Sequence, residues 1–219
     1  IHMEEDAGKL IHDISENSSL VDLNRAGVPL IEIVTEPDIS HPEEAIEYLK
    51  RLRKILIFAG VSDCDMEKGN FRCDANISLR PIGEKELGVK TEIKNVNSFK
   101  FVQKALEYEI VRQSKILEKG EEIIQETRLF NSSNNKTYSM RTKEDAHDYR
   151  YFPDPDLQPL ILEKSYIQSL REDIGQSYDD KTKYLISIGL TEDDADILLS
   201  NSKLIDYFDK TIEILNQPK

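Results

Sequence analysis

One ten-residue segment, residues 71–80, constrains the fold more than any other part of the chain. Its apolar and polar residues alternate strictly, which predicts a strand with one covered face and one polar face. The covered face carries Phe71, Cys73, Ala75, Ile77 and Leu79, and the polar face carries Arg72, Asp74, Asn76, Ser78 and Arg80. Guanidinium, carboxylate and hydroxyl groups are the side chains that hold phosphate and metal ions. The segment therefore predicts a sheet with a polar face that is either wet or catalytic.

Two other segments place a carboxylate on a predicted strand. Glu32 lies inside the apolar, β-branched run of residues 28–36, which predicts a buried strand. In residues 88–95, Lys90, Glu92 and Lys94 alternate with Val89, Thr91 and Ile93. An ionised carboxylate on a partly covered sheet face is costly unless it is paired or binds a cation. The pattern alone leaves both a wet sheet face and a catalytic one open.

Two long helices are predicted to cover this sheet. The first spans residues 41–59, from a Ser40 cap to Gly60, and the second begins after Ser98 and ends at Gly120. The apolar residues expected to face inward are Ala45, Ile46, Leu49, Leu52, Ile55 and Leu56 in the first helix, and Phe101, Val102, Ala105, Leu106, Ile110 and Val111 in the second. Their helical spacing gives each helix one apolar stripe.

Short strands are also expected at residues 123–130 and 136–142. Together these elements predict an α+β fold, an antiparallel sheet with flanking helices. After Leu162 the pattern changes to short helical pieces, among them residues 192–199 and 202–215. We therefore expect two domains, which are residues 1–162 and a small helical domain over residues 163–219.

The net charge of −13 argues against a chain that binds nucleic acid over a broad surface, because proteins that bind through phosphate contacts usually carry the opposite charge. Any RNA contact is expected to be local or to belong to a partner or a further domain. The two cysteines are too few for a disulfide framework or a zinc site, which favours a reducing compartment. No apolar run reaches a transmembrane length, and no signal peptide is visible.

The carboxylates and cations of the predicted strands suggest a magnesium–phosphate site. Magnesium takes one or two carboxylates and the oxygens of substrate phosphates. The candidate oxygen ligands are Glu4, Glu32, Asp74 and Glu92, and the candidate phosphate-binding cations are Arg72, Arg80, Lys90, Lys94 and Lys9. The nine glycines form neither a GxGxxG nor a GxxxxGK[ST] loop. A nucleotide would therefore bind on a sheet face, through a metal and cations, as in glutamine synthetase and the guanidino kinases.

Longer motifs at these residues identify a family. They are His2–Lys9 (HMEEDAGK), Val21–Asp38, Arg72–Ser78 (RCDANIS), Lys94–Phe99 (KNVNSF) and Asp148–Pro153 (DYRYFP). The chain resembles the B-subunit family of the tRNA-dependent amidotransferases over nearly its whole length. These enzymes convert Glu-tRNA(Gln) to Gln-tRNA(Gln), or Asp-tRNA(Asn) to Asn-tRNA(Asn).

The resemblance implies a fold, a reaction and partners. The first domain would be a glutamine-synthetase-like cradle, followed by the start of the family's helical domain. ATP would phosphorylate the tRNA-bound carboxylate, and ammonia from glutamine would displace the phosphate. An amidase A subunit would release that ammonia, and a small C subunit would stabilise the A–B pair. The protein would be located in a bacterial cytoplasm or an organellar matrix.

The resemblance also implies site residues. The metal ligands would be Glu4 and Glu32, with Asp74 as a further ligand, and Mg²⁺ and ATP would be the cofactors. We assign catalytic roles to Glu32, Asp74 and Arg72, and cofactor binding to Arg80, Lys90, Glu92, Lys94 and Lys9. The acceptor end of the tRNA is expected near Lys90, Lys94 and Arg150, with Tyr149 and Tyr151 available to stack on bases.

Family segments on both sides are absent from this sequence, namely strands with a Glu-x-His motif and a tail domain that contacts tRNA. We therefore expect a central fragment of a longer protein that is inactive in isolation. Two other interpretations remain open at this point. One is a stand-alone carboxylate–amine ligase of the glutamine-synthetase kind, and the other is a non-catalytic surface that binds the amidase subunit.

Overall fold

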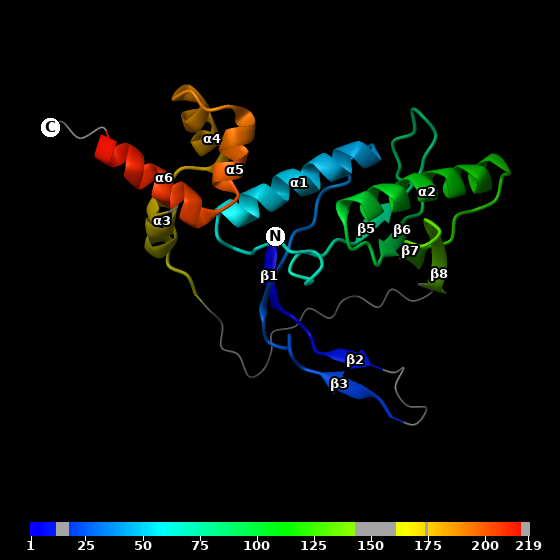
Figure 1. The fold of residues 1–219 in the computed structure, drawn as a ribbon. Coiled ribbons are helices and arrows are strands. Elements are labelled where there is room, and N and C mark those ends of the chain that lie inside the picture. The colour runs from blue at the N-terminus through cyan, green and yellow to red at the C-terminus, as the bar shows by residue number, and fades with distance from the viewer. Residues whose placement is uncertain (12–17, 143–160, 174, 216–219) are drawn as a thin grey trace. The chain divides into compact units, whose positions relative to one another are not determined.

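A computed structural model describes residues 1–11, 18–142, 161–173 and 175–215 (Figure 1). The chain divides into two compact units, Ile1–Ser40 and His41–Lys219. Each unit is described by itself below. The Asp148–Pro153 motif, which holds the predicted tRNA contacts Tyr149, Arg150 and Tyr151, lies outside the described residues.

The first unit consists of two antiparallel ribbons. Strand β1 (His2–Glu5) pairs with β4 (Pro29–Glu32), and β2 (Lys9–Ile11) pairs with β3 (Leu20–Asp22). The prediction of a buried strand over residues 28–36 is wrong in length and in burial. The strand ends at Glu32, and Val34 beyond it is 68% exposed. A two-stranded ribbon has no second layer within its own unit, so its apolar residues stay in contact with solvent.

Two helices of the second unit agree closely with the predicted ones. Helix α1 spans Pro42–Phe58, and the positive φ of Gly60 follows its end. Its cap is His41 and not Ser40, because Pro42 takes the first helical position and the residue before it becomes the cap. Helix α2 spans Phe99–Glu118, and the Ser98 hydroxyl accepts a hydrogen bond from its first turn.

The sheet of the second unit has four strands in the order β5 (Ala75–Ile77), β6 (Thr91–Lys94), β7 (Glu126–Asn131) and β8 (Lys136–Thr142). Pairs β5–β6 and β7–β8 are antiparallel as predicted, but β6 and β7 are parallel, so the sheet is mixed. The reason is that the chain leaves β6, crosses over through α2 and returns along β7, and a crossover of this kind joins parallel strands. Strand β5 is also shorter than the predicted strand over residues 71–80.

The predicted covered face of the sheet is confirmed. Helix α2 runs along the sheet (Figure 1), and the core between the sheet and helices α1 and α2 contains Ile46, Leu49, Ile93, Val96, Val102, Ala105, Leu106 and Phe130. Cys73, Ala75 and Ile77 pack against this core, whereas Asp74 and Asn76 are exposed. Burial, helped by the neighbouring Asp74 charge, raises the pKa of the Cys73 thiol to about 11.

Four helices follow: α3 (Lys164–Asp173), α4 (Tyr178–Ser187), α5 (Glu192–Leu199) and α6 (Ser202–Leu215). The last two match their predicted bounds, and Thr191 caps α5 as a good N-cap residue should. A second core gathers Tyr178, Leu185, Ala195, Leu199 and Ile205. Within the described residues, no helix has the length and apolarity needed to cross a membrane. The fold is mixed α and β; the cradle likeness and the boundary at residue 162 stay predictions.

Candidate functional site

The first candidate site is the His2 group, which consists of His2, Glu4 and Glu32. Residues two apart on a strand share a face, so His2 and Glu4 leave β1 on the same side. The β1–β4 register places Glu32 opposite His2. The His2 Nε2 atom lies 2.8 Å from Glu32 Oε2 and 3.8 Å from Glu4 Oε2. The predicted proximity of Glu4 and Glu32 is therefore confirmed, and their role as ligands stays a prediction.

The donor set of the His2 group suits a divalent cation. One nitrogen or oxygen atom from each of the three side chains lies within 4.8 Å of the others, and no other such group of three occurs among the described residues. The side chains are 40–46% exposed, so water or a phosphate oxygen can reach a bound ion. Two carboxylates suit Mg²⁺ or Mn²⁺, and the 2.8 Å contact of His2 holds one of them in place.

The second candidate site is the Lys94 group, which consists of Asp74, Glu92, Lys94 and Thr127. It lies on the face of the second unit's sheet opposite the core, at strands β5 to β7. Lys94 Nζ lies 2.8 Å from Asp74 Oδ2 and 3.3 Å from Glu92 Oε1. The Thr127 hydroxyl donates to Glu92 Oε2 at 2.8 Å. The four side chains form one continuous polar chain that runs from β7 across β6 to Asp74, the residue before β5.

Lys94 keeps its charge in this position. Burial lowers the pKa of its ammonium group, but hydrogen bonds and charges from Asp74 and Glu92 outweigh that effect, and the pKa is raised above its ordinary value. An ammonium group has three donors. Two of them face the carboxylates of this group, and among the described residues no further partner is seen for the third, which can serve an oxygen of a ligand.

The remaining predicted phosphate-binding cations lie on other parts of the two units. Arg80 Nη1 donates to the Lys85 carbonyl at 2.5 Å, which ties down the connection between β5 and β6. Arg72 and Lys90 are exposed near the sheet, and Lys9 is exposed on β2 in the first unit. Asp74 pairs with Lys94, so its carboxylate has a partner other than a metal. The phosphate-binding roles of these residues stay predictions.

Sequence reasoning missed His2 and Thr127. The alternation of His2 with Glu4 on a strand could have shown that they share a face. Thr127 had no comparable signal, because its place beside Glu92 depends on the parallel pairing of β6 with β7. That pairing joins residues 35 positions apart in the chain.

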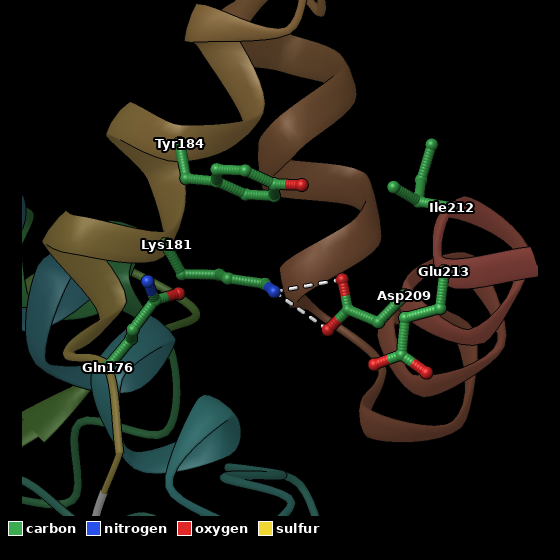
Figure 2. A pocket seen from close by; sticks show the side chains of 6 residues that line it. All are labelled: Gln176, Lys181, Tyr184, Asp209, Ile212 and Glu213. Carbon is green, nitrogen blue, oxygen red and sulfur yellow. Dashed lines mark hydrogen bonds and ion pairs between the residues drawn. The ribbon is translucent and has the colours of Figure 1, made fainter. Parts of the chain in front are cut away.

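A small hollow in the helical part of the chain carries no predicted site residue (Figure 2). Its volume is about 250 Å³, and Gln176, Lys181, Tyr184, Asp209, Ile212 and Glu213 line it. Both carboxylate oxygens of Asp209 accept from Lys181 Nζ, at 2.8 and 2.7 Å. The Lys181 ammonium also lies 5.1 Å from the centre of the Tyr184 ring. Because its cation is engaged on two sides, this hollow is a poor candidate for a phosphate site.

Comparison with known proteins gives a consistent result. A family model described as the GatB/GatE catalytic domain matches residues 1–168. Two relatives, from Lawsonia intracellularis and Persephonella marina, are each 56% identical over 220 and 218 residues. A third, from Thermodesulfovibrio yellowstonii, is 53% identical over 220 residues. Each of the three is named as the B subunit of an aspartyl/glutamyl-tRNA(Asn/Gln) amidotransferase. The matches cover 99–100% of this chain and 46% of each relative, so the chain spans about half the length of these curated relatives.

Proposed function

Since the chain belongs to the GatB/GatE catalytic domain family, we propose that it is the part of an amidotransferase B subunit that activates the carboxylate of a misacylated tRNA. The substrate is Glu-tRNA(Gln), Asp-tRNA(Asn) or both, in keeping with the name that the relatives carry. The observation that carries the proposal is the His2 group, in which two carboxylates and an imidazole converge.

The proposed reaction proceeds in two steps. A carboxylate oxygen of the aminoacyl group bonds to the γ-phosphorus of ATP, and the bond from that phosphorus to ADP breaks. The nitrogen of ammonia then attacks the side-chain carbon of this acyl phosphate. Inorganic phosphate leaves, and the nitrogen loses a proton. Both steps concentrate negative charge on phosphoryl oxygens, which fixed cations stabilise.

The two groups contribute in different ways. Glu4 and Glu32 supply oxygen ligands for Mg²⁺, and His2 orients Glu32 through its 2.8 Å contact. Bound Mg²⁺ would neutralise phosphate oxygens of ATP. Lys94 offers its remaining N–H to a phosphoryl oxygen, while Asp74 and Glu92 hold its ammonium in place. Arg72, Arg80, Lys90 and Lys9 are further candidates for phosphate contact.

The proposed partners are the amidase A subunit, which releases ammonia from glutamine, and the small C subunit. The subunit name of the relatives favours this interpretation over a stand-alone carboxylate–amine ligase. The test uses a complete B subunit that carries this sequence. We expect it to be retained by an immobilised A subunit and to release phosphate from ATP only when misacylated tRNA is present. Phosphate release at the same rate with free glutamate would support the stand-alone ligase, and retention without any phosphate release would support the non-catalytic surface.

We expect the 219-residue chain alone to bind tRNA weakly, with a Kd above about 1 µM even at low salt. It carries 42 acidic side chains against 29 basic ones, so its net negative charge opposes the binding of a polyanion. Contact is expected only at the acceptor end, where Lys90 and Lys94 are candidate partners. A filter-binding titration measures the affinity, with the complete subunit in its complex as the tighter-binding comparison. Sub-micromolar binding by the chain alone would place the main RNA surface within these residues.

A further inference from the structure

Thr127 links the Lys94 group to the interior of the second unit. The residue is fully buried, yet its hydroxyl donates to Glu92 Oε2 at 2.8 Å. The parallel register pairs Thr127 directly with Glu92, so the two side chains leave the same face of the sheet. The exposed fraction then rises along the group, from 14% for the Glu92 side chain to 36% for Lys94 and 49% for Asp74. Thr127 is thus the buried end of a polar chain that leads out to solvent.

The hydrogen bond from Thr127 fixes the orientation of the Glu92 carboxylate. Oε2 accepts from Thr127, and Oε1 faces the Lys94 ammonium at 3.3 Å. A carboxylate that is largely removed from water needs such donors, and each oxygen here has its own. Without the hydroxyl, Glu92 could rotate to bring both oxygens toward Lys94. The ammonium would then lose its fixed place between Glu92 and Asp74.

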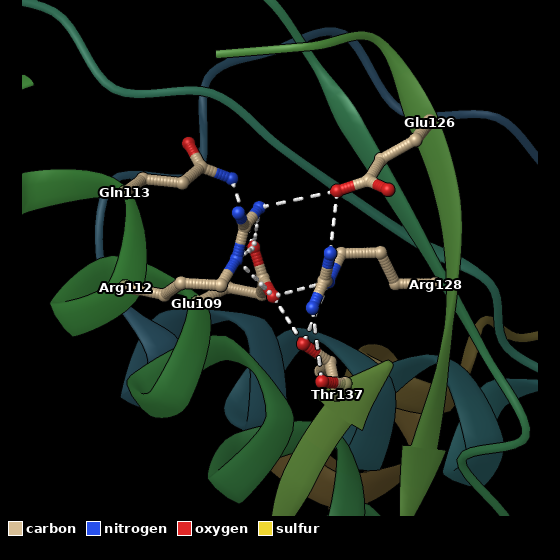
Figure 3. Close-up of polar contacts among 6 residues, drawn as sticks. All are labelled: Glu109, Arg112, Gln113, Glu126, Arg128 and Thr137. Atoms are coloured by element: carbon tan, nitrogen blue, oxygen red, sulfur yellow. Dashed lines mark hydrogen bonds and ion pairs between the residues drawn. The ribbon is translucent and has the colours of Figure 1, made fainter. Parts of the chain in front are cut away.

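The strand that carries Thr127 is itself held from the opposite face. The neighbours Glu126 and Arg128 enter a buried polar network with Glu109 of α2 (Figure 3). Arg128 donates to the Thr137 hydroxyl and to the Thr137 carbonyl, both at 2.9 Å, and so also ties β7 to β8. The β7–β8 register shifts between Thr127 and Arg128. An irregularity of this kind often re-aims a side chain next to a functional site.

We infer that Thr127 is a positioning residue for the ATP-dependent step. It acts through Glu92, which it holds so that Lys94 directs its remaining N–H at a phosphoryl oxygen. The inference rests on the proposed function, because it assigns Lys94 to the phosphoryl group of that reaction. It adds a residue that touches no substrate and whose hydroxyl, not its bulk, is required.

The test compares three variants of the complete B subunit in complex with the A and C subunits. Thr127→Val keeps the shape and removes the hydroxyl, whereas Thr127→Ser keeps the hydroxyl and removes a methyl group. Thr91→Val is the matched control, because Thr91 is equally buried in the same sheet and its hydroxyl has no hydrogen-bond partner within the part of the chain that the structure describes. Phosphate release is measured over a range of ATP concentrations, with saturating Glu-tRNA(Gln) and ammonium chloride as the nitrogen source. Melting temperatures are measured in parallel.

We expect kcat of Thr127→Val to fall about tenfold or more, with a smaller change in KM for ATP. The reason is that Lys94 loses its fixed place, and its contact acts on charge that develops on the phosphoryl group in the transition state. Thr127→Ser should melt at a lower temperature and keep kcat within about threefold, since the hydroxyl remains. Thr91→Val should keep kcat. A Thr127→Val enzyme with unchanged kcat, or a Thr127→Ser enzyme as slow as Thr127→Val, would overturn the inference. A wild-type complex without ATP-dependent phosphate release would overturn the proposed function as well.

Discussion

Replacing Glu32 by Gln in a complete B subunit is expected to lower ATP-dependent amidation of Glu-tRNA(Gln) by about a thousandfold or more. The amide has nearly the shape of the carboxylate, but it carries no charge and is a poor magnesium ligand. The Glu32 side chain is 46% exposed, so its replacement should leave the far-UV circular dichroism spectrum unchanged. The measurement is the initial rate of Gln-tRNA(Gln) formation in the complex with the A and C subunits.

The control for this variant is Glu5→Gln, which makes the same change on the strand that carries Glu4. Glu5 is exposed and follows Glu4 directly, so it leaves β1 on the opposite face from the His2 group. Its amidation rate should stay within about twofold of wild type. If Glu32→Gln keeps more than about a tenth of the wild-type rate, the His2 group is not the metal site.

Replacing Glu109 by Gln is expected to have the largest effect on stability, a loss of about 3 kcal/mol or more in the free energy of unfolding. Glu109 is fully buried, accepts hydrogen bonds from Arg112, Thr137 and Gln113, and forms an ion pair with Arg128 (Figure 3). The Arg112 and Arg128 side chains are 18% and 12% exposed. With a neutral amide at position 109, Glu126 is the remaining carboxylate that balances their two charges. Urea denaturation of the 219-residue chain measures the difference.

The exposed Glu107 offers a control on the same helix, and Glu107→Gln should change stability by less than about 0.5 kcal/mol. The pH dependence gives a second check. Burial raises the pKa of Glu109, but hydrogen bonds from Arg112, Thr137 and Gln113 outweigh it and the pKa lies below its ordinary value of 4.5. Its stabilisation is therefore complete above pH 4.5 and is lost as the pH falls through the lowered pKa. The difference in the free energy of unfolding between wild type and Glu109→Gln should therefore become smaller as the pH falls over that range. A difference that is small at pH 7 would show that the network does not hold α2 to the sheet.

Features that depend on local signals could be predicted from the sequence. The Ser98 cap and the Gly120 stop bound α2, and Thr191 begins α5, because each acts on the backbone within one turn of its own position. The covered face at Cys73, Ala75 and Ile77 followed from simple alternation.

Features that depend on pairing between distant parts of the chain could not be predicted from the sequence. The inward stripe of α2 is Val102, Ala105, Leu106, Glu109 and Gln113, whose spacing is helical but whose last two members are polar. The apolar pattern favours Val111 over Glu109 as an inward residue, yet Val111 is 52% exposed and Glu109 is buried. The burial of Glu109 depends on Arg128 of a distant strand. The candidate site divides in the same way: the carboxylates could be found in the sequence, and the Thr127 contact could not.

The central claim is that ATP phosphorylates the carboxylate of the aminoacyl group on tRNA, and an isotope experiment tests it most directly. Glutamate labelled with ¹⁸O in its side-chain carboxylate is charged onto tRNA(Gln) and given to the complete complex with ATP and ammonia. Phosphorylation of that carboxylate transfers one oxygen to phosphorus, so the released inorganic phosphate should contain one ¹⁸O atom per turnover, and Glu32→Gln should release almost none. Phosphate that carries no ¹⁸O while Gln-tRNA(Gln) accumulates would show that the carboxylate is not phosphorylated, and would contradict the proposed reaction.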